Sequence, residues 1–154
     1  MTARVVERLK VSNPEQMHEF GLRLARNLKV GDLVLLTGPL GAGKTTLTRG
    51  VGEGLNTIGT VSSPTFVIAR THQRENGEAP LVHVDAYRLS SPAEFDDLDI
   101  DLERSITLVE WGRGFTNDLA ESWLDIEIDR SSADDERIVT VTGHGPGWLE
   151  RGIA

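Results

Sequence analysis

The spacing of glycines around a lysine and a threonine predicts a phosphate-binding loop near residue 40. Gly38 is followed, after four residues, by Gly43, Lys44 and Thr45. The apolar run 33–36 before this motif is typical of a strand buried on both faces, and helix-compatible residues follow the lysine. Glycines leave room for successive backbone N–H groups to surround a phosphate at a helix N-terminus. Lys44 would add a cation, and Thr45 a hydroxyl that can bind magnesium.

Two carboxylates at strand ends are candidates for the metal side of the same site. Largely apolar runs at 81–84 and 106–109 end in Asp85 and Glu110 respectively. Phosphate-loop proteins commonly place an acid in this position, because a magnesium ion beside phosphates needs a hard anionic oxygen nearby. Many strands end in an acid at a loop, so either residue alone is weak evidence. Two such strands strengthen the prediction, but they leave open which role each carboxylate has.

Three other side chains have functional and purely structural interpretations. Thr65 lies in Ser-Pro-Thr-Phe (63–66), where proline fixes the backbone before an exposed hydroxyl. A threonine on such a loop can sense a terminal phosphate or its magnesium, or it can belong to an ordinary turn before a strand. His83 is interpreted as a packed or surface strand residue rather than a base or ligand, since no second histidine lies at metal-binding spacing. Trp111 is interpreted as a core aromatic.

The elements that would position these residues begin with a capped helix before the loop strand. Asn13 can cap, Pro14 takes the first helical position, and Gln16 can reach back to the cap. Apolar residues then recur at spacings of three and four as far as Leu28, which gives the helix one apolar face. A second helix is predicted after the phosphate loop, weakened at its far end by glycines at positions 50, 52 and 54.

Two further pairs of strands are predicted after the second helix, and the first pair is expected to be antiparallel. Residues 66–72 and 80–85 are strand-like, and the Asn-Gly pair at 76–77 between them is a strong hairpin signal. The alternating segments 124–128 and 137–141 are predicted to be the final two strands, joined by a polar turn. The hairpin departs from a simple repeat of strand and helix.

Length and composition limit the classes of protein that the chain can represent. Its 154 residues fit one domain, 1–154, in which 143–154 is left unassigned as a tail. The net charge of -8 argues against general electrostatic affinity for DNA, RNA or an anionic membrane, so any link to RNA would run through a partner. No cysteine is present, which excludes disulfides and thiol nucleophiles. Charges near the N-terminus and the lack of a long apolar run favour a cytoplasmic protein.

Four motifs occur in a fixed order along the chain. They are Gly-Pro-Leu-Gly-Ala-Gly-Lys-Thr-Thr (38–46), Ser-Pro-Thr-Phe (63–66), His-Val-Asp-Ala-Tyr-Arg-Leu (83–89) and Leu-Val-Glu-Trp (108–111). Together they resemble the bacterial TsaE family, also called YjeE, over nearly the whole chain. The resemblance implies a three-layer α/β phosphate-loop NTPase fold with a mostly parallel central sheet and an antiparallel hairpin near 66–85.

The resemblance also implies a biological task. Members of this family are the ATPase component of the machinery that forms threonylcarbamoyladenosine in tRNA. The chain would bind ATP with Mg²⁺ and hydrolyse it in company with TsaB-like and TsaD-like proteins. The TsaD-like partner would be the transferase, so this chain would meet tRNA only indirectly, through the complex.

The same resemblance assigns roles to residues around the phosphates. Thr45 and Glu110 would be the magnesium ligands, and Asp85 would lie beside the metal and orient its waters or the attacking water. Thr65 would be the switch residue. The residues that would cradle the phosphates are Gly41, Ala42, Gly43, Lys44, Thr45 and Thr46.

The resemblance also implies roles for residues near the nucleoside of ATP, and it raises the question of which arginine compensates charge on the phosphates. Arg137 resembles an arginine that helps hold the nucleotide, and Asn13 or Pro14 would lie against the adenine. No arginine finger is evident from the sequence. Arg88 is one candidate, and a contact supplied by a partner is another. In the second case the isolated protein would hydrolyse ATP slowly.

Two other functions use a loop of this kind. A small-molecule or nucleotide kinase would need an acceptor pocket and usually an arginine-bearing lid, for which this short chain has no evident insert. An ATP-gated scaffold would need binding without obligatory hydrolysis. A guanine-nucleotide switch is disfavoured, because the sequence has no Asn-Lys-x-Asp motif.

Overall fold

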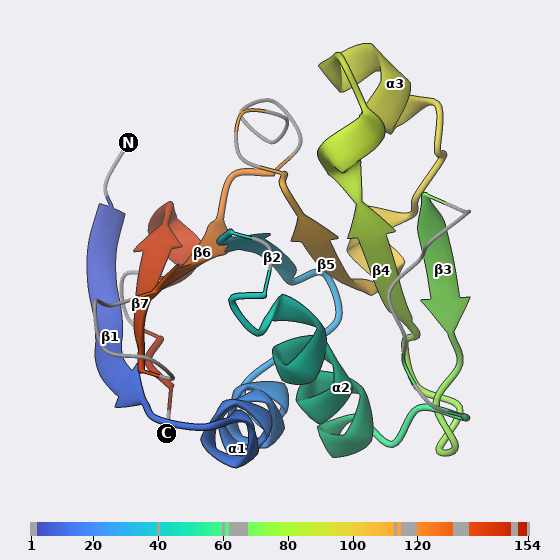
Figure 1. Ribbon diagram of the computed structural model, residues 1–154. Helices are drawn as coiled ribbons and strands as arrows, with labels where there is room; N and C mark the ends of the chain where they lie inside the picture. Colours follow the sequence, from blue (N-terminus) through green and yellow to red (C-terminus); the bar gives the residue numbers. More distant parts are fainter. Residues whose placement is uncertain are drawn as a thin grey trace.

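The computed structural model describes residues 3–39, 41–59, 61, 68–112, 114, 120–130, 136–148 and 151–153. Within these residues, seven strands form one sheet in the order β1-β7-β6-β2-β5-β4-β3 (Figure 1). The strands are β1 (Ala3–Val11), β2 (Leu33–Thr37), β3 (Ala69–His72), β4 (Leu81–Asp85), β5 (Ile106–Glu110), β6 (Trp123–Arg130) and β7 (Arg137–His144). The helices are α1 (Pro14–Ala25), α2 (Lys44–Gly54) and α3 (Pro92–Asp96), with 3-10 turns η1 (Ala86–Arg88), η2 (Leu102–Arg104) and η3 (Pro146–Trp148).

The centre of the sheet is parallel and its two sides are antiparallel. β2 pairs in parallel with β5 and β6, and β4 pairs in parallel with β5. β3 runs antiparallel to β4, which confirms the predicted hairpin. β7 runs antiparallel to both β6 and β1. Among the described strands, antiparallel pairs are therefore as numerous as parallel ones, and the sheet is mixed rather than mostly parallel.

Side chains of β2 alternate between two hydrophobic clusters, one on each face of the sheet. Val34 and Leu36 pack with residues of α1 and α2, whereas Leu33 and Leu35 pack with Phe95 of α3. A strand that is covered on both faces needs a continuous apolar run, which is why this one does not alternate with polar residues. The cover is uneven, because the helices of 12 and 11 residues lie on one face and the five-residue α3 on the other (Figure 1).

Helix α1 begins as the sequence predicts. The Asn13 side chain accepts a hydrogen bond from the backbone N–H of Gln16 at 2.8 Å, and Pro14 occupies the first turn. The Gln16 side chain accepts in return from the backbone N–H of Ser12, also at 2.8 Å. These bonds satisfy donors that the helix itself cannot pair. They also fix the direction in which the chain leaves β1 for the helix-covered face.

Glycines at the crossing of α1 and α2 bring the two helices into backbone contact. A Cβ atom added at Gly21 would lie 2.9 Å from Cα of Gly50 and would overlap the carbonyl oxygen of Leu47. One added at Gly50 would overlap the carbonyl oxygen of His18. The expected weakening of α2 by its glycines is thus offset by this close approach, and the helix continues to Gly54. The crossing sets the position of the N-terminus of α2.

The C-terminal segment, which the sequence left unassigned as a tail, packs into the core. β7 extends to His144, past the predicted start of the tail, and Trp148 is only 2% exposed in the cluster that contains α1 and α2. A Cβ atom added at Gly143 would lie 2.6 Å from Cβ of Trp148, so glycine makes room for the indole. The guanidinium of Arg151 lies 3.8 Å from the centre of the same ring.

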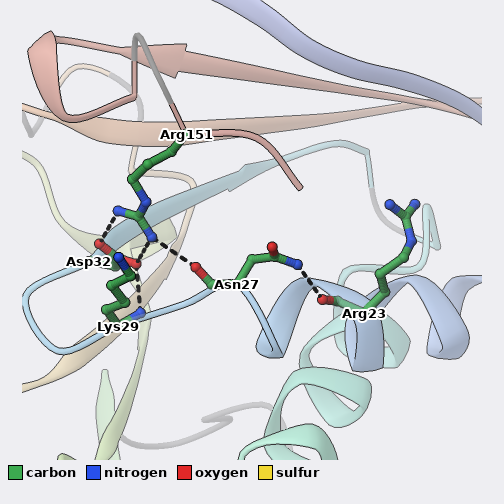
Figure 2. Close-up of polar contacts among 5 residues, drawn as sticks. All are labelled: Arg23, Asn27, Lys29, Asp32 and Arg151. Atoms are coloured by element: carbon green, nitrogen blue, oxygen red, sulfur yellow. Dashed lines mark hydrogen bonds and ion pairs between the residues drawn. The ribbon is translucent and has the colours of Figure 1, made fainter. Parts of the chain in front are cut away.

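Arg151 also ties this segment to the loop between α1 and β2 (Figure 2). Its Nη1 and Nη2 atoms donate to the two carboxylate oxygens of Asp32 at 2.9 and 2.8 Å, and Nη2 donates to the carbonyl oxygen of Asn27 at 2.8 Å. Within the loop, the Lys29 backbone N–H donates to Asp32 at 2.7 Å, and the Asn27 side chain donates to the carbonyl oxygen of Arg23 at 2.9 Å. A bidentate arginine–carboxylate pair has a defined geometry, so it fixes the position of the loop that leads into β2.

Replacement of Trp148 by alanine is expected to lower the free energy of unfolding by about 3–5 kcal/mol, because a large buried side chain leaves a cavity that the core fills only in part. Chemical denaturation monitored by circular dichroism would measure the loss. Gly152→Ala is the matched control in the same segment, since its added Cβ would meet no atom within 4 Å. If both variants were as stable as the unchanged protein, this segment would not belong to the cooperative core.

Candidate functional site

The loop between β2 and α2 has a backbone that only glycine adopts readily. Gly41 has a φ of 78°, and Gly43, which precedes the first residue of α2, has a φ of 110°. Both angles lie in the left-handed region, where a Cβ atom causes strain. A Cβ atom at Gly43 would also lie 3.2 Å from Cε of Met17 on α1. The loop therefore wraps tightly around the N-terminus of α2, where backbone N–H groups have no partner within the helix.

A cleft of about 410 Å³ opens beside this loop. It brings together eight of the predicted site residues, namely Gly41, Ala42, Gly43, Lys44, Thr45, Thr46, Asp85 and Glu110. Among the described residues, the lining consists of Pro39, Gly41, Ala42, Gly43, Lys44, Thr45, Thr46, Asp85, Glu110 and Trp111.

Strand register explains why the carboxylates meet the loop. Glu110 lies opposite Asp85 in the β4–β5 pair and opposite Leu36 in the β2–β5 pair. All three residues are at the carboxyl ends of neighbouring parallel strands, which is where sites form in sheets of this kind. The loop that follows β2 therefore starts at the same edge of the sheet as both acids.

Lys44 is held in place although it is charged and only 6% exposed. Its Nζ atom donates to the carbonyl oxygens of Gly38 and, at 3.3 Å, Pro39, and lies 4.1 Å from the centre of the Trp111 ring. Burial lowers the pKa of Lys44 from its ordinary value, and the charges of Glu110 and Asp85 counteract this. The lysine thus stays beside the cleft as a partly desolvated cation.

Trp111 lines the cleft, although the sequence suggested only a core aromatic. Its backbone N–H donates to the carbonyl oxygen of Leu36 at 3.0 Å, which joins the end of β5 to the end of β2. Its ring meets that of Tyr87 edge-on, with centroids 5.4 Å apart, and Tyr87 is 70% exposed. The position directly after the strand-end acid was the signal that could have placed the tryptophan here.

A histidine that the sequence did not place in the site contacts Glu110. His83 is fully buried at 0% exposed, and its Nε2 atom lies 2.7 Å from Oε2 of Glu110, which is itself 6% exposed. The interpretation of His83 as a strand residue is correct, but it missed this contact. Alternation along β4 places His83 on the same face as Asp85, two residues later, and this was the available signal.

A second, smaller cleft of about 140 Å³ shares residues Gly41, Ala42, Gly43 and Thr46 with the first. It gathers the residues predicted for the nucleoside end, namely Asn13, Pro14 and Arg137. The Arg137 side chain donates to the carbonyl oxygen of Gly41 at 3.3 Å. The described residues that line it are Val11, Asn13, Pro14, Met17, Gly41, Ala42, Gly43, Thr46 and Arg137. The loop residues shared by both clefts join them into one candidate site.

Two predicted residues are not brought into the clefts. Arg88 is exposed at the end of η1 and does not line either cleft among the described residues. Thr65 and the rest of its motif lie outside the described residues. The interpretation of Thr65 as a switch residue therefore stays a prediction.

The donors in the larger cleft fit a phosphate chain with a hard cation. The glycines of the loop would present backbone rather than side chains to a bound anion, and Lys44 supplies positive charge. Thr45, Asp85 and Glu110 offer oxygen atoms, which magnesium prefers. The described residues contain no group of three or more histidine, cysteine or acidic side chains that could hold a metal alone. Such an ion would depend on phosphate and water for its remaining ligands, as magnesium usually does.

Comparison with known proteins gives one consistent result. The family model described as threonylcarbamoyl adenosine biosynthesis protein TsaE matches residues 11–139. A Streptomyces coelicolor protein, named tRNA threonylcarbamoyladenosine biosynthesis protein TsaE, is 56% identical over 144 residues, which cover 90% of this chain and 97% of that one. A Bacillus subtilis protein of the same name is 40% identical over 86% of this chain and 83% of its own length.

A solved structure has the same fold. The crystal structure of Bacillus subtilis YdiB superposes with a TM-score of 0.74 at 32% sequence identity, and the match covers 96% of this chain and 91% of that one. Among the described residues, no helix has both the length and the apolar character needed to cross a membrane.

Proposed function

The chain belongs to the TsaE family of threonylcarbamoyl adenosine biosynthesis proteins, and we propose that it contributes to tRNA threonylcarbamoyladenosine formation as a magnesium-dependent ATPase. The observation that carries this proposal is the cleft where Lys44, Thr45, Asp85 and Glu110 meet beside the glycine loop. A cation, a hydroxyl and two carboxylates at a helix N-terminus suit a nucleoside triphosphate with a hard cation. We assign residues 1–154 to one domain with a three-layer phosphate-loop fold.

The phosphates would be held by the backbone N–H groups of residues 41–46 and by Lys44. In the structure, the backbone N–H of Ala42 donates to the carbonyl oxygen of Pro39 at 3.1 Å, and Nζ of Lys44 donates to the carbonyl oxygens of Gly38 and Pro39. These donors would exchange those partners for phosphate oxygens. Fixed donors aimed at the phosphates offset the charge that shifts toward the leaving group during phosphoryl transfer. Positioning and charge compensation are the main contributions a protein makes to this reaction.

The metal side of the cleft would be formed by Thr45 and Glu110, with Asp85 next to them. Mg²⁺, when bound, neutralises phosphate charge and orders water around it. Asp85 is half-buried and already accepts a hydrogen bond from the Tyr87 backbone N–H at 3.0 Å, which fixes its side chain. From that position it would orient the attacking water. Thr65 would act as the switch residue that responds to the terminal phosphate.

The nucleoside end would occupy the smaller cleft. Asn13 or Pro14 would lie against the adenine, and Arg137 would help to hold the nucleotide. Asn13 is committed to capping α1, so the wall it forms is rigid. The hydrogen bond from Arg137 to the Gly41 carbonyl oxygen links the start of β7 to the phosphate loop.

Protein partners would complete the machinery. Arg88 does not line the described clefts, so charge compensation by an arginine, or closure of the loop, would come from TsaB-like and TsaD-like proteins. The net charge of -8 disfavours direct binding of tRNA, which would be reached only through the complex. We place this complex in the cytoplasm.

The kinase alternative differs in where the phosphoryl group goes. A kinase needs an acceptor hydroxyl, whereas an ATPase passes the group to water. Release of inorganic phosphate in the absence of any acceptor would support the ATPase. Phosphate release only when a hydroxyl compound is added would support the kinase.

Stimulation by partners is the first test of the proposal. At saturating ATP and Mg²⁺, the isolated protein is expected to release phosphate slowly, and addition of purified TsaB-like and TsaD-like proteins is expected to raise the rate at least about tenfold, because a supplied arginine or closed loop stabilises the transition state. A coupled assay for inorganic phosphate would measure both rates. Equal turnover with and without the partners would contradict the proposed dependence.

A further inference from the structure

His83 is a buried polar residue that the proposed reaction does not use. It lies on β4 between two strands, opposite Arg70 of β3 and Leu108 of β5, and no part of it is exposed. Its Nδ1 atom has no hydrogen-bond partner among the described residues. A buried polar atom without a partner costs stability, and an apolar residue of similar size would avoid that cost. Packing alone therefore does not account for a histidine here.

The contact that His83 does make is directed at the candidate site. Its Nε2 atom lies 2.7 Å from Oε2 of Glu110, and both groups are almost completely shielded from water. A carboxylate that holds a metal is ionised and can only accept hydrogen bonds. Nε2 must then be the donor to Oε2 of Glu110. The contact therefore directs the His83 donor at a carboxylate that lines the candidate site.

We propose that His83 is a positioning residue that holds the Glu110 carboxylate in the orientation needed for Mg²⁺. The hydrogen bond holds Oε2 of Glu110 against His83 on β4. The other carboxylate oxygen then remains available to a ligand in the cleft that Glu110 lines. Without the hydrogen bond, the carboxylate can rotate about its terminal bonds, whose preferences are broad. This inference rests on the proposed function, because it assigns a role toward the magnesium of that site.

The strands make such an arrangement rigid. His83 and Glu110 lie on β4 and β5, which are paired in parallel over five residues. Both side chains are on the face covered by α2, so neither can turn to solvent without opening the sheet. Partners that orient a metal ligand in this way typically change metal affinity by about 10–100-fold when they are removed.

The test compares two replacements of His83 that fill the same space. His83→Leu keeps an apolar volume but cannot donate, whereas His83→Gln places an amide N–H near the position of Nε2. ATP binding would be measured by calorimetry over a series of Mg²⁺ concentrations and, separately, with EDTA. Mg²⁺ is expected to raise the ATP affinity of each protein. The Mg²⁺ concentration that gives half of this increase is expected to be about 10–100-fold higher for the leucine variant. The glutamine variant should stay within about threefold of the unchanged protein, and neither variant should change ATP affinity in EDTA.

His72→Leu is the matched control, because it removes a neighbouring histidine from β3. The Nε2 atom of His72 is also buried and has no partner among the described residues, but His72 makes no contact with Glu110 in the structure. Its Mg²⁺ dependence should equal that of the unchanged protein. A loss common to all three variants would mean that any change in this part of the sheet disturbs the site, and would overturn the assignment to His83.

Folding and the proposed function are separated within the same experiment. If His83→Leu does not fold, His83→Asn replaces it, because its shorter amide cannot reach Glu110. The asparagine variant should then need more Mg²⁺ than the glutamine variant. If Mg²⁺ raises the ATP affinity of the unchanged protein and of every His83 variant to the same extent, the positioning role is wrong, while the magnesium site stands. If the unchanged protein itself shows no Mg²⁺ dependence, the magnesium site and the inference both fail.

Discussion

Lys44→Ala is expected to weaken ATP binding by about 10–100-fold, which corresponds to the loss of charged hydrogen bonds worth roughly 1.5–3 kcal/mol. Lys44 is the lysine that lines the cleft, and burial concentrates the effect of its charge on the phosphates. Calorimetry with ATP and Mg²⁺ would measure the change. An unaltered affinity would contradict the assignment of this cleft as the nucleotide site.

The Lys44 experiment needs a control for charge and one for stability. Lys29→Ala removes the same charge from an exposed position in the loop before β2, and should leave ATP affinity unchanged. Lys44 also donates hydrogen bonds to the carbonyl oxygens of Gly38 and Pro39, so its removal leaves two acceptors in the loop without this donor. Thermal unfolding of both variants without nucleotide would show whether a loss of affinity comes from a damaged loop.

Glu110→Gln is expected to lower the rate of ATP hydrolysis by about 100–1000-fold at saturating ATP and Mg²⁺, in the presence of the partners. The amide has almost the shape of the carboxylate and can still accept a hydrogen bond from His83, but it lacks the negative charge at the metal position. Loss of one such fixed electrostatic contact has an effect of this size. Phosphate release measures the rate, and Glu103→Gln, at an exposed position on η2, is the control.

The same position separates hydrolysis from an ATP-gated scaffold. If binding alone served the complex, Glu110→Ala would still support threonylcarbamoyladenosine formation in tRNA despite its lost hydrolysis. Failure of modification by a variant that still assembles with the partners would exclude the scaffold. We expect failure, because the two strand-end carboxylates lie where catalysis and not only binding would need them.

Local signals in the sequence were sufficient for several parts of the fold. The cap at Asn13, the hairpin around residues 76–77 and the glycine loop each depend on a few adjacent residues, and each is present as predicted. The meeting of Asp85 and Glu110 also followed from local patterns, since both acids end apolar runs that pair in parallel. These features need little information about distant parts of the chain.

Features that depend on distant contacts were not predictable in the same way. Glycine in a helix has a low intrinsic propensity, and only the position of α1 shows that Gly50 permits close packing. His83 looked like an ordinary strand residue because its partner is 27 positions away on another strand. The role of residues 143–148 depends on the packing of Trp148 in a cluster to which distant strands and helices contribute, and no local pattern encodes this.

The pairing of β1 with β7 has a consequence for how the protein is made. Ala3 lies opposite His144 and Val11 opposite Arg137, so in the described residues β1 finds its hydrogen-bonding partner only in a strand 126 to 141 positions later. During synthesis, β1 must remain without this partner until residues 137–144 have emerged from the ribosome. Contacts this distant slow folding and leave an open strand edge exposed to wrong partners. The first of the described strands is thus expected to be among the last to be fixed in place.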